Sequence, residues 1–247
     1  MRVRLAAGVF AFVVVGLAAC AASCLLTSNL DDLHGGAPKD SGLDLGESCD
    51  PTQCTSSAMV VSLSSIAPCS TDTVQADRVA CRKVIHDICV SADPCCNQGG
   101  FGPVEFPNST QATILCVNAT VVYTAPWTEV TTAEPGCTSI SQAGSRTCDE
   151  GVHLAAKKRG LATAIYQLVN GDGTATFAGF DDSLADVETA IDWSAMTAEV
   201  SGCTEANVDK EACTTAAHRY CVDTFGDTTG YGPVAWDDTS VTLACIY

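Results

Sequence analysis

Apolar residues recur at helical spacing in two distant stretches of the chain. On a helical wheel of residues 81–89, a stripe about 140° wide gathers Cys81, Val84, Ile85, Ile88 and Cys89. Residues 213–221 repeat the stripe with Cys213, Ala216, Ala217, Tyr220 and Cys221. Each pattern predicts an amphipathic helix whose cysteines lie on its buried face.

A third, weaker copy of this pattern lies between the two, in the stretch TCDEGVHLAAKKRG. In all three stretches a histidine stands five residues after a cysteine, in the pairs Cys81/His86, Cys148/His153 and Cys213/His218. The middle stretch ends in Lys157 and Lys158, which suit the negative end of a helix, and Gly160 is a natural cap. The sequence therefore predicts a third helix here.

Two strand-like segments follow each predicted helix. The first segments open with glycine and close with an aromatic residue: GFGPVEF from Gly100, GLATAIY from Gly160 and GYGPVAW from Gly230. The second segments centre on threonine: QATILCV, TATFAGF and SVTLACI. In the middle copy they are separated by NGDG, from Asn170 to Gly173, which is a strong hairpin signal.

These matches predict an α+β fold of three tandem, disulfide-stapled modules, each one helix plus a hairpin-like pair of strands. The expected ranges are 1–19 for a signal peptide, 20–48 for a disordered acidic tether, and 49–117, 118–181 and 182–247 for the modules, the second a degraded copy. Each module alone is too small to bury a sizeable core. Disulfides and packing between modules are expected to compensate.

The pairing of the sixteen cysteines is suggested by what the middle copy lacks. It has Ala156 and Gly179 where both outer copies have cysteines, and partners tend to be lost together because a lone exported thiol is reactive. The predicted disulfides are Cys69–Cys81, Cys89–Cys116, Cys137–Cys148, Cys203–Cys213 and Cys221–Cys245. Four more cysteines are expected to pair among themselves in an undetermined order: Cys49, Cys54, Cys95 and Cys96.

The N-terminus has the order of a secretion signal. Arg2 and Arg4 precede an apolar run of about fifteen residues, which is short for a bilayer span. An exported chain with many cysteines is expected to form disulfides, because oxidising compartments preserve them. Cys24 is left without an assigned partner.

The apolar run ends in Leu17-Ala18-Ala19-Cys20, which resembles the lipobox of bacterial lipoproteins. The resemblance implies cleavage before Cys20, a diacylglycerol on its sulfur and anchoring in the lipid bilayer. Ala21 at the next position implies the outer membrane of a Gram-negative cell envelope. The alternative is an ordinary signal, cut after Ala21 or Ala22, and a secreted protein.

The charge balance makes nucleic acid an improbable partner. The chain has 12 Lys and Arg against 29 Asp and Glu, a formal net charge of −17, and such a surface repels phosphate backbones. Acidity also favours divalent cations. A calcium loop is one interpretation of Asn170 to Gly173 with Asp181 and Asp182, although the regular ligand alternation of an EF-hand is missing.

Three equivalent histidines are the best candidates for chemistry. His86, His153 and His218 could converge on a pseudo-threefold axis and offer three imidazoles to zinc. Each also lies at the flank of the buried stripe, where a hydrogen bond to backbone of its own module is the simpler role. No cofactor is expected, with zinc or calcium as the alternatives.

Phe101 and Tyr231, in the glycine-rich turns, are candidate ligand-binding aromatics, with buried packing as the alternative. No catalytic motif such as GxSxG or HExxH is present, so no catalytic residue is assigned. The expected function is a surface-anchored, non-enzymatic binding or structural module for an unknown carbohydrate or protein ligand. The alternatives are a metal-dependent enzyme using the three histidines and a secreted protein resembling a protease inhibitor.

Overall fold

The computed structural model describes residues 54–69, 75–92, 96, 98–226 and 229–247, all within the unit Glu47–Tyr247 of the chain. The predicted signal peptide and tether, with Cys20 and Cys24, lie outside the described residues, as do Cys49 and Cys95. In the described part of the chain, no helix is both long and apolar enough to cross a membrane.

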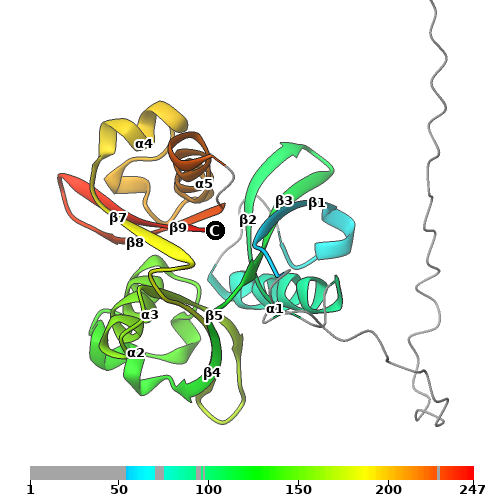
Figure 1. Ribbon diagram of the computed structural model, residues 1–247, viewed down its shortest axis with the longest axis vertical. Coiled ribbons are helices and arrows are strands. Elements are labelled where there is room, and N and C mark those ends of the chain that lie inside the picture. The colour runs from blue at the N-terminus through cyan, green and yellow to red at the C-terminus, as the bar shows by residue number, and fades with distance from the viewer. Residues whose placement is uncertain (1–53, 70–74, 93–95, 97, 227–228) are drawn as a thin grey trace, which may run out of the picture. The chain divides into compact units, whose positions relative to one another are not determined.

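The fold is mixed α+β, as the sequence predicts, and its strands form small three-stranded sheets (Figure 1). Sheet 1 contains, in spatial order, β1 (Ser57–Ser62), β3 (Gln111–Asn118) and β2 (Gln98–Asn108). Sheet 2 contains β4 (Val121–Pro126), β6 (Thr174–Phe180) and β5 (Thr163–Val169). Sheet 3 contains β7 (Ala185–Asp192), β9 (Ser240–Ile246) and β8 (Thr229–Trp236). All neighbouring strands are antiparallel.

A long helix connects the first and second strand of each sheet. These helices are α1 (Gln75–Ala92), α3 (Arg146–Lys158) and α5 (Glu211–Phe225), and they contain the predicted cysteine-bearing stripes. Shorter helical segments precede them: η3 (Leu63–Ile66), α2 (Thr128–Ala133), η4 (Ile140–Gln142), α4 (Trp193–Glu199) and η5 (Glu205–Asn207). The ends of α3 follow elementary capping rules, since Ser145 Oγ accepts a hydrogen bond from the Cys148 amide and Gly160 follows with a φ of 81°.

The prediction of one helix plus two strands omits the first strand of each sheet. The apolar runs of β1 and β4, AMVV and VVY, are short, and both strands are mostly exposed or half-buried along their length. Each of the three omitted strands pairs instead with the free edge of the last strand of its own sheet. The predicted hairpins themselves are present, as β2–β3, β5–β6 and β8–β9.

The predicted alignment of Gly160, in the middle segment GLATAIY, with Gly100 and Gly230 is wrong. Gly160 caps α3, and β5 begins only at Thr163. In the ladder Ala164 pairs with Gly179, as Gly100 pairs with Cys116 and Gly230 with Cys245. Ala164 rather than Gly160 is therefore the counterpart of the two strand glycines.

Gly100 and Gly230 are required because each strand passes very close to its helix. A Cβ at Gly100 would lie 2.6 Å from the backbone carbon of Ile85, and a Cβ at Gly230 would lie 2.4 Å from Cys221 Sγ. A helix and a strand can approach this closely only where a side chain is missing.

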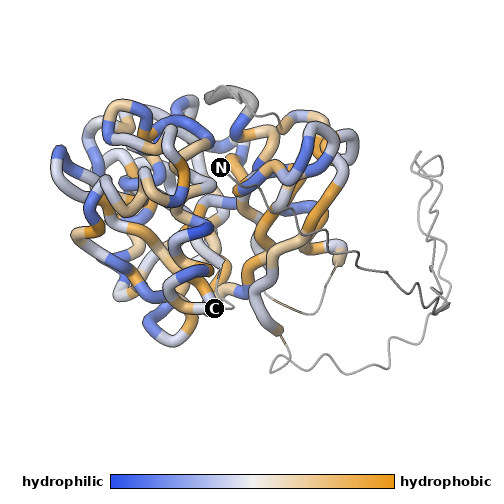
Figure 2. The backbone as a smooth tube through the Cα atoms, turned by 90° about the horizontal axis from the view of Figure 1, so that it is seen from above, coloured by the Kyte–Doolittle hydropathy of each residue, from blue (hydrophilic) through white to orange (hydrophobic). Residues whose placement is uncertain are grey.

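The two faces of each sheet contribute to different hydrophobic cores. In β3, Ile114 and Cys116 pack with α1, whereas the alternate residues Leu115 and Val117 belong to a core that all three sheets share. Separate cores lie between each sheet and its own helices. Figure 2 shows hydrophobic stretches along the tube and hydrophilic residues mainly at the periphery of the folded part.

The long helices also bridge the sheets. Helix α1 contacts β5, α3 contacts β8, and α5 contacts β2. Each helix thus packs on its own sheet and on the next one, and the third helix returns to the first sheet (Figure 1). The contacts form a closed cycle.

The structure brings together all five cysteine pairs inferred from the sequence: Cys69–Cys81, Cys89–Cys116, Cys137–Cys148, Cys203–Cys213 and Cys221–Cys245. Cys54 is bonded to Cys96. Helix α3 and sheet 2 have Ala156 and Gly179 in place of the helix-to-strand cysteine pair. There the side chain of Leu161 packs against Gly179, so closely that a Cβ at Gly179 would lie 2.6 Å from Leu161 Cδ1. This many disulfides are typical of a protein in an oxidising or extracellular compartment.

Candidate functional site

The residue that follows the helix cysteine is polar in all three long helices. These residues are Arg82 in α1, Asp149 in α3 and Thr214 in α5, and all three are buried. Arg82 Nη2 donates to both carboxylate oxygens of Asp149, at 2.9 and 3.0 Å. The equivalent positions of three helices therefore belong to one buried polar cluster.

The guanidinium of Arg82 also lies over two aromatic rings. Its central carbon is 4.0 Å from the ring centroid of Tyr166 and 4.8 Å from that of Phe101, distances at which a cation is attracted to an aromatic face. Burial, the largest single effect, lowers the pKa of Arg82, but Asp149, Tyr166 and Tyr231 together outweigh it, and the pKa lies above its usual value. Arg82 Nη1 is buried and has no hydrogen-bond partner among the described residues.

The side chain of Arg146, the first residue of α3, reaches α5. Its Nη2 donates to Thr214 Oγ1, its Nε donates to the Val208 carbonyl at 3.3 Å, and its Nη1 lies 3.4 Å from Asp149 Oδ2. Burial lowers the pKa of Arg146 below its usual value, partly offset by Asp149. Asp149 is thus shared by two guanidinium groups.

Arg78 adds a third guanidinium from α1. Its Nη1 donates to the Gly144 carbonyl at 2.9 Å, and its Nη2 donates to the Asp209 carbonyl. Gly144 precedes α3 and Asp209 precedes α5, so one arginine of α1 binds the entry to both other long helices. Arg78 is only half-buried, in contrast to Arg82 and Arg146.

Glu211, the first residue of α5, completes the cluster. Its Oε1 is shielded from solvent without a hydrogen-bond partner in the described ranges. Burial raises the pKa of Glu211 to about 7, although Arg146, Arg78 and Arg82 act in the opposite direction. The carboxyl group therefore changes its charge near neutral pH.

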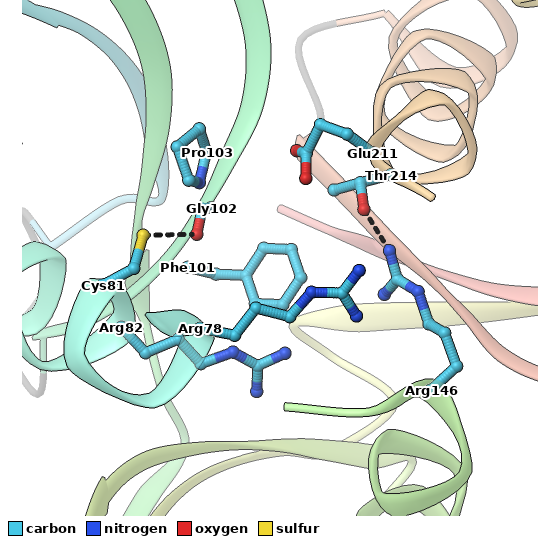
Figure 3. A pocket seen from close by; sticks show the side chains of 9 residues that line it. All are labelled: Arg78, Cys81, Arg82, Phe101, Gly102, Pro103, Arg146, Glu211 and Thr214. Atoms are coloured by element: carbon cyan, nitrogen blue, oxygen red, sulfur yellow. Dashed lines mark hydrogen bonds between the residues drawn. The ribbon is translucent and has the colours of Figure 1, made fainter. Parts of the chain in front are cut away.

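These side chains line a small, partly open cavity (Figure 3). Its volume is about 30 Å³, room for one or two water-sized particles, and Arg78, Arg82, Arg146, Glu211 and Thr214 contribute its polar lining. The apolar part of the lining is Phe101 and Pro103. Figure 3 shows the three guanidinium groups and the Glu211 carboxyl group directed toward this common space. With Asp149 beside them, three positive charges face two carboxyl groups.

The three histidines do not form the metal site considered above. His86 Nδ1 donates to Gln167 Oε1 at 3.1 Å, and the same oxygen accepts a 2.7 Å hydrogen bond from the Gly100 amide. Gln167 belongs to β5, so this contact joins α1 to sheet 2 rather than to its own glycine-led segment alone. No group of three or more His, Cys, Asp or Glu side chains among the described residues is arranged to hold a metal ion.

His153 begins a second chain of hydrogen bonds between sheets. The Tyr231 hydroxyl donates to the Ala164 carbonyl at 2.8 Å, so it accepts from Thr163 Oγ1, 2.7 Å away. Thr163 in turn accepts from His153 Nδ1 at 3.1 Å. Burial, and secondarily Lys157, lowers the pKa of His153 to about 4, so the imidazole is neutral at pH 7.

His218 differs from its two counterparts. It is buried, its Nδ1 has no hydrogen-bond partner within the described part of the chain, and burial lowers its pKa. Nearby Glu105 and Arg219, which form an ion pair, act on its pKa with opposite signs. The equivalence of the three histidines in sequence thus does not extend to their hydrogen bonds.

The candidate ligand-binding aromatics are in the core. Phe101 is 3% exposed and Tyr231 is 2% exposed, and their ring centroids lie 5.0 Å apart in the core that the three sheets share. Both rings are therefore packed in the core, as in the alternative to ligand binding, and neither is displayed at the surface. The sheet register, which alternates helix-facing and core-facing side chains, turns both rings inward.

The proposed calcium ligands have local roles. Asp172 Oδ1 accepts from the amide and hydroxyl of Thr174, at 3.0 and 2.7 Å, and Asp181 Oδ1 does the same for Ser183. Such hydrogen bonds stabilise tight turns. Asn170 to Gly173 form the β5–β6 turn as predicted, without a convergence of carboxylates.

Sequence reasoning missed the arginine cluster. One signal was available: Arg82 and Asp149 occupy the same position after the helix cysteine, with opposite charges. Equivalent positions that carry opposite charge are expected to meet if the copies pack around an axis. The charge of Arg82 beside a buried stripe was a second signal, since arginine is rarely buried without a partner.

No family model, curated protein or solved structure matches this chain.

Proposed function

We propose that this chain is an exported, lipid-anchored protein whose folded part is a non-enzymatic binding or structural module. In this proposal the folded part is three copies of one unit, at 49–117, 118–181 and 182–247. Each sheet with its long helix falls within one of these ranges, except that β3 extends one residue further to Asn118, and the sheets have the same strand order. The shared topology supports the repeat.

One observation carries the non-enzymatic role: the side chains best suited to chemistry are used to join the units. His86 reaches the second unit through Gln167, and His153 reaches the third through Thr163 and Tyr231. Arg82 and Asp149 likewise join the first and second units. His153, Arg82 and Asp149 are buried in these contacts and cannot meet a substrate unless the units separate.

The anchoring part of the proposal rests on the lipobox-like ending of the apolar run at Cys20 and on the polar stretch that follows. The disulfides of the folded part support export, because they persist in oxidising compartments. A polar tether would hold the folded part away from the membrane surface.

The test is metabolic labelling with a fatty acid in a Gram-negative host that expresses the full chain. Wild-type protein should carry the label and fractionate with the outer membrane. Cys20→Ala should lose both properties, whereas the matched control Cys24→Ala should keep them. Unchanged labelling of Cys20→Ala, or loss of label in Cys24→Ala alone, would contradict anchoring through Cys20.

The non-enzymatic role is tested by His153→Gln in the same purified protein. A residue that joins units should lower the unfolding midpoint when it is replaced, without any change in metal content. Stoichiometric zinc in the wild type that His153→Gln abolishes would support the metal-dependent enzyme instead.

A further inference from the structure

We propose that the cavity lined by Arg78, Arg82 and Arg146 is a binding site for one small inorganic monovalent anion. The inference goes beyond the proposed function, because it needs neither the lipid anchor nor the repeat. It rests on the composition of the cavity, its size and the unpaired polar atoms that line it.

The cavity concentrates positive charge in a strongly acidic chain. Three guanidinium groups line it or reach it, whereas the whole chain has a formal net charge of −17. Asp149 neutralises part of this charge, and its oxygens are engaged by Arg82 and Arg146. When Glu211 is protonated, three positive charges face the single negative charge of Asp149, and an anion in the cavity reduces the imbalance.

An unpaired donor points to a ligand. Arg82 is 5% exposed and its Nη1 has no hydrogen-bond partner among the described side chains and backbone groups. A buried guanidinium nitrogen without an acceptor is unfavourable, and an anion or water molecule in the adjoining cavity would supply the acceptor. The geometry favours an anion because the neighbouring donors, on Arg78 and Arg146, are also cationic.

The size of the cavity limits the ligand. A volume of about 30 Å³ holds one or two water-sized particles, which fits a halide ion and excludes sugars, nucleotides and phosphorylated metabolites. Chloride is therefore the probe of choice.

Glu211 couples anion binding to pH. Its carboxyl group faces the same cavity, and the charged groups that act on it are Arg146 from α3 and Arg78 and Arg82 from α1. An ionised Glu211 would repel the anion and compete for the same guanidinium groups, so the anion should bind to the protein in which Glu211 is protonated. Raising the pH through 7 should release it.

The experiment measures the excess ³⁵Cl NMR line width that the oxidised full chain produces, in chloride–gluconate mixtures of constant ionic strength. At pH 6 the excess should saturate with chloride and should be displaced by bromide. At pH 8.5 the apparent affinity should be about 30-fold weaker, because only about 3% of the molecules would still hold the proton on Glu211. No saturable excess in the wild type at pH 6 would overturn the proposal.

Two variants distinguish chloride binding in the cavity from chloride binding on the protein surface. Arg78→Gln should weaken chloride binding at least tenfold, whereas Lys83→Gln, which removes the same charge from an exposed position of α1, should leave it unchanged. Equal effects of the two substitutions would show adventitious surface binding and overturn the proposal. Where Arg78→Gln fails to fold, Glu211→Gln decides: at pH 8.5 it should bind chloride about 30-fold more tightly than the wild type, and unchanged weak binding would overturn the proposal.

Discussion

Arg82 of α1 and Asp149 of α3 form a buried ion pair in which both side chains are almost inaccessible, with 6% and 4% of their surface exposed. Each residue directly follows a disulfide-bonded cysteine of its helix, Cys81 in α1 and Cys148 in α3. Their contact joins segments that are 67 positions apart in the chain, so it forms only when the long helices come together.

Replacing Asp149 should lower the free energy of unfolding more than replacing Arg82. Asp149→Asn leaves two buried guanidinium groups without their carboxylate and should lower the free energy of unfolding by about 3–5 kcal/mol. Arg82→Met should have a smaller effect, because Asp149 keeps its contact with Arg146. Urea unfolding followed by circular dichroism measures both losses.

The matched control for these two variants is Lys83→Met, which breaks an exposed ion pair with Asp87 and should change the free energy of unfolding by less than about 1 kcal/mol. An equal or larger loss in Arg82→Met than in Asp149→Asn would contradict the shared role of Asp149.

Gly179 should tolerate no side chain. Gly179→Ala places a Cβ 2.6 Å from Leu161 Cδ1 and should lower the free energy of unfolding by about 1–3 kcal/mol. Gly171→Ala is the control, since nothing lies within 4 Å of a Cβ there. Adding Leu161→Ala to Gly179→Ala should cost less than the sum of the two single losses, and simple additivity would refute the steric explanation.

His153 should make the free energy of unfolding depend on pH below neutrality. Its pKa falls from 6.5 to about 4 on folding, so the unfolded chain binds the proton more tightly and stability falls as the pH drops from 6.5 to 4. The full effect is about 3 kcal/mol. In His153→Gln, the free energy of unfolding at pH 7 minus that at pH 4.5 should be lower than in the wild type by about 2 kcal/mol, because only the opposite effect of Glu211 then remains. A value equal to that of the wild type would rule out this titration.

Glu211 should change the free energy of unfolding in the opposite direction as the pH rises. Its pKa rises from 4.5 to about 7 on folding, so the folded state holds the proton more tightly and the contribution to stability is lost as the pH rises from 4.5 to 7. Because this window overlaps that of His153, the wild type alone should show a shallow net dependence. Glu211→Gln should gain stability relative to the wild type between pH 5 and pH 8 in gluconate buffer, and a constant offset over this range would count against the assignment.

Nonreducing peptide mapping should recover the pairs Cys89–Cys116 and Cys221–Cys245. The same digest should contain Cys54 joined to Cys96, and we expect Cys49 joined to Cys95, the two cysteines that then remain of the four. Replacing Cys89 and Cys116 together by alanine should lower the free energy of unfolding by roughly 3–4 kcal/mol, given the 27-residue separation. A fragment that joins Cys89 to Cys221 would contradict the pairing within each unit.

Local pattern was enough to predict the long helices, the hairpins and five cysteine pairs. A stripe such as Cys81, Ile85 and Cys89 needs only the 3.6-residue period to identify a buried helix face. The joint replacement of two cysteines by Ala156 and Gly179 suggested a pair without any knowledge of distance. Both kinds of signal concern contacts within one sheet and its own helix.

The tertiary structure alone decided which side chains meet between the three sheets. His86 could have turned to its own backbone, and Phe101 and Tyr231 could have faced solvent, but the closed cycle of helix and sheet contacts placed all three at junctions between sheets. The free energy of such contacts depends on segments that are distant in the chain, so neither periodicity nor spacing encodes them. For the same physical reason, the arginine-lined cavity and the protonation of Glu211 follow only from the assembled helices.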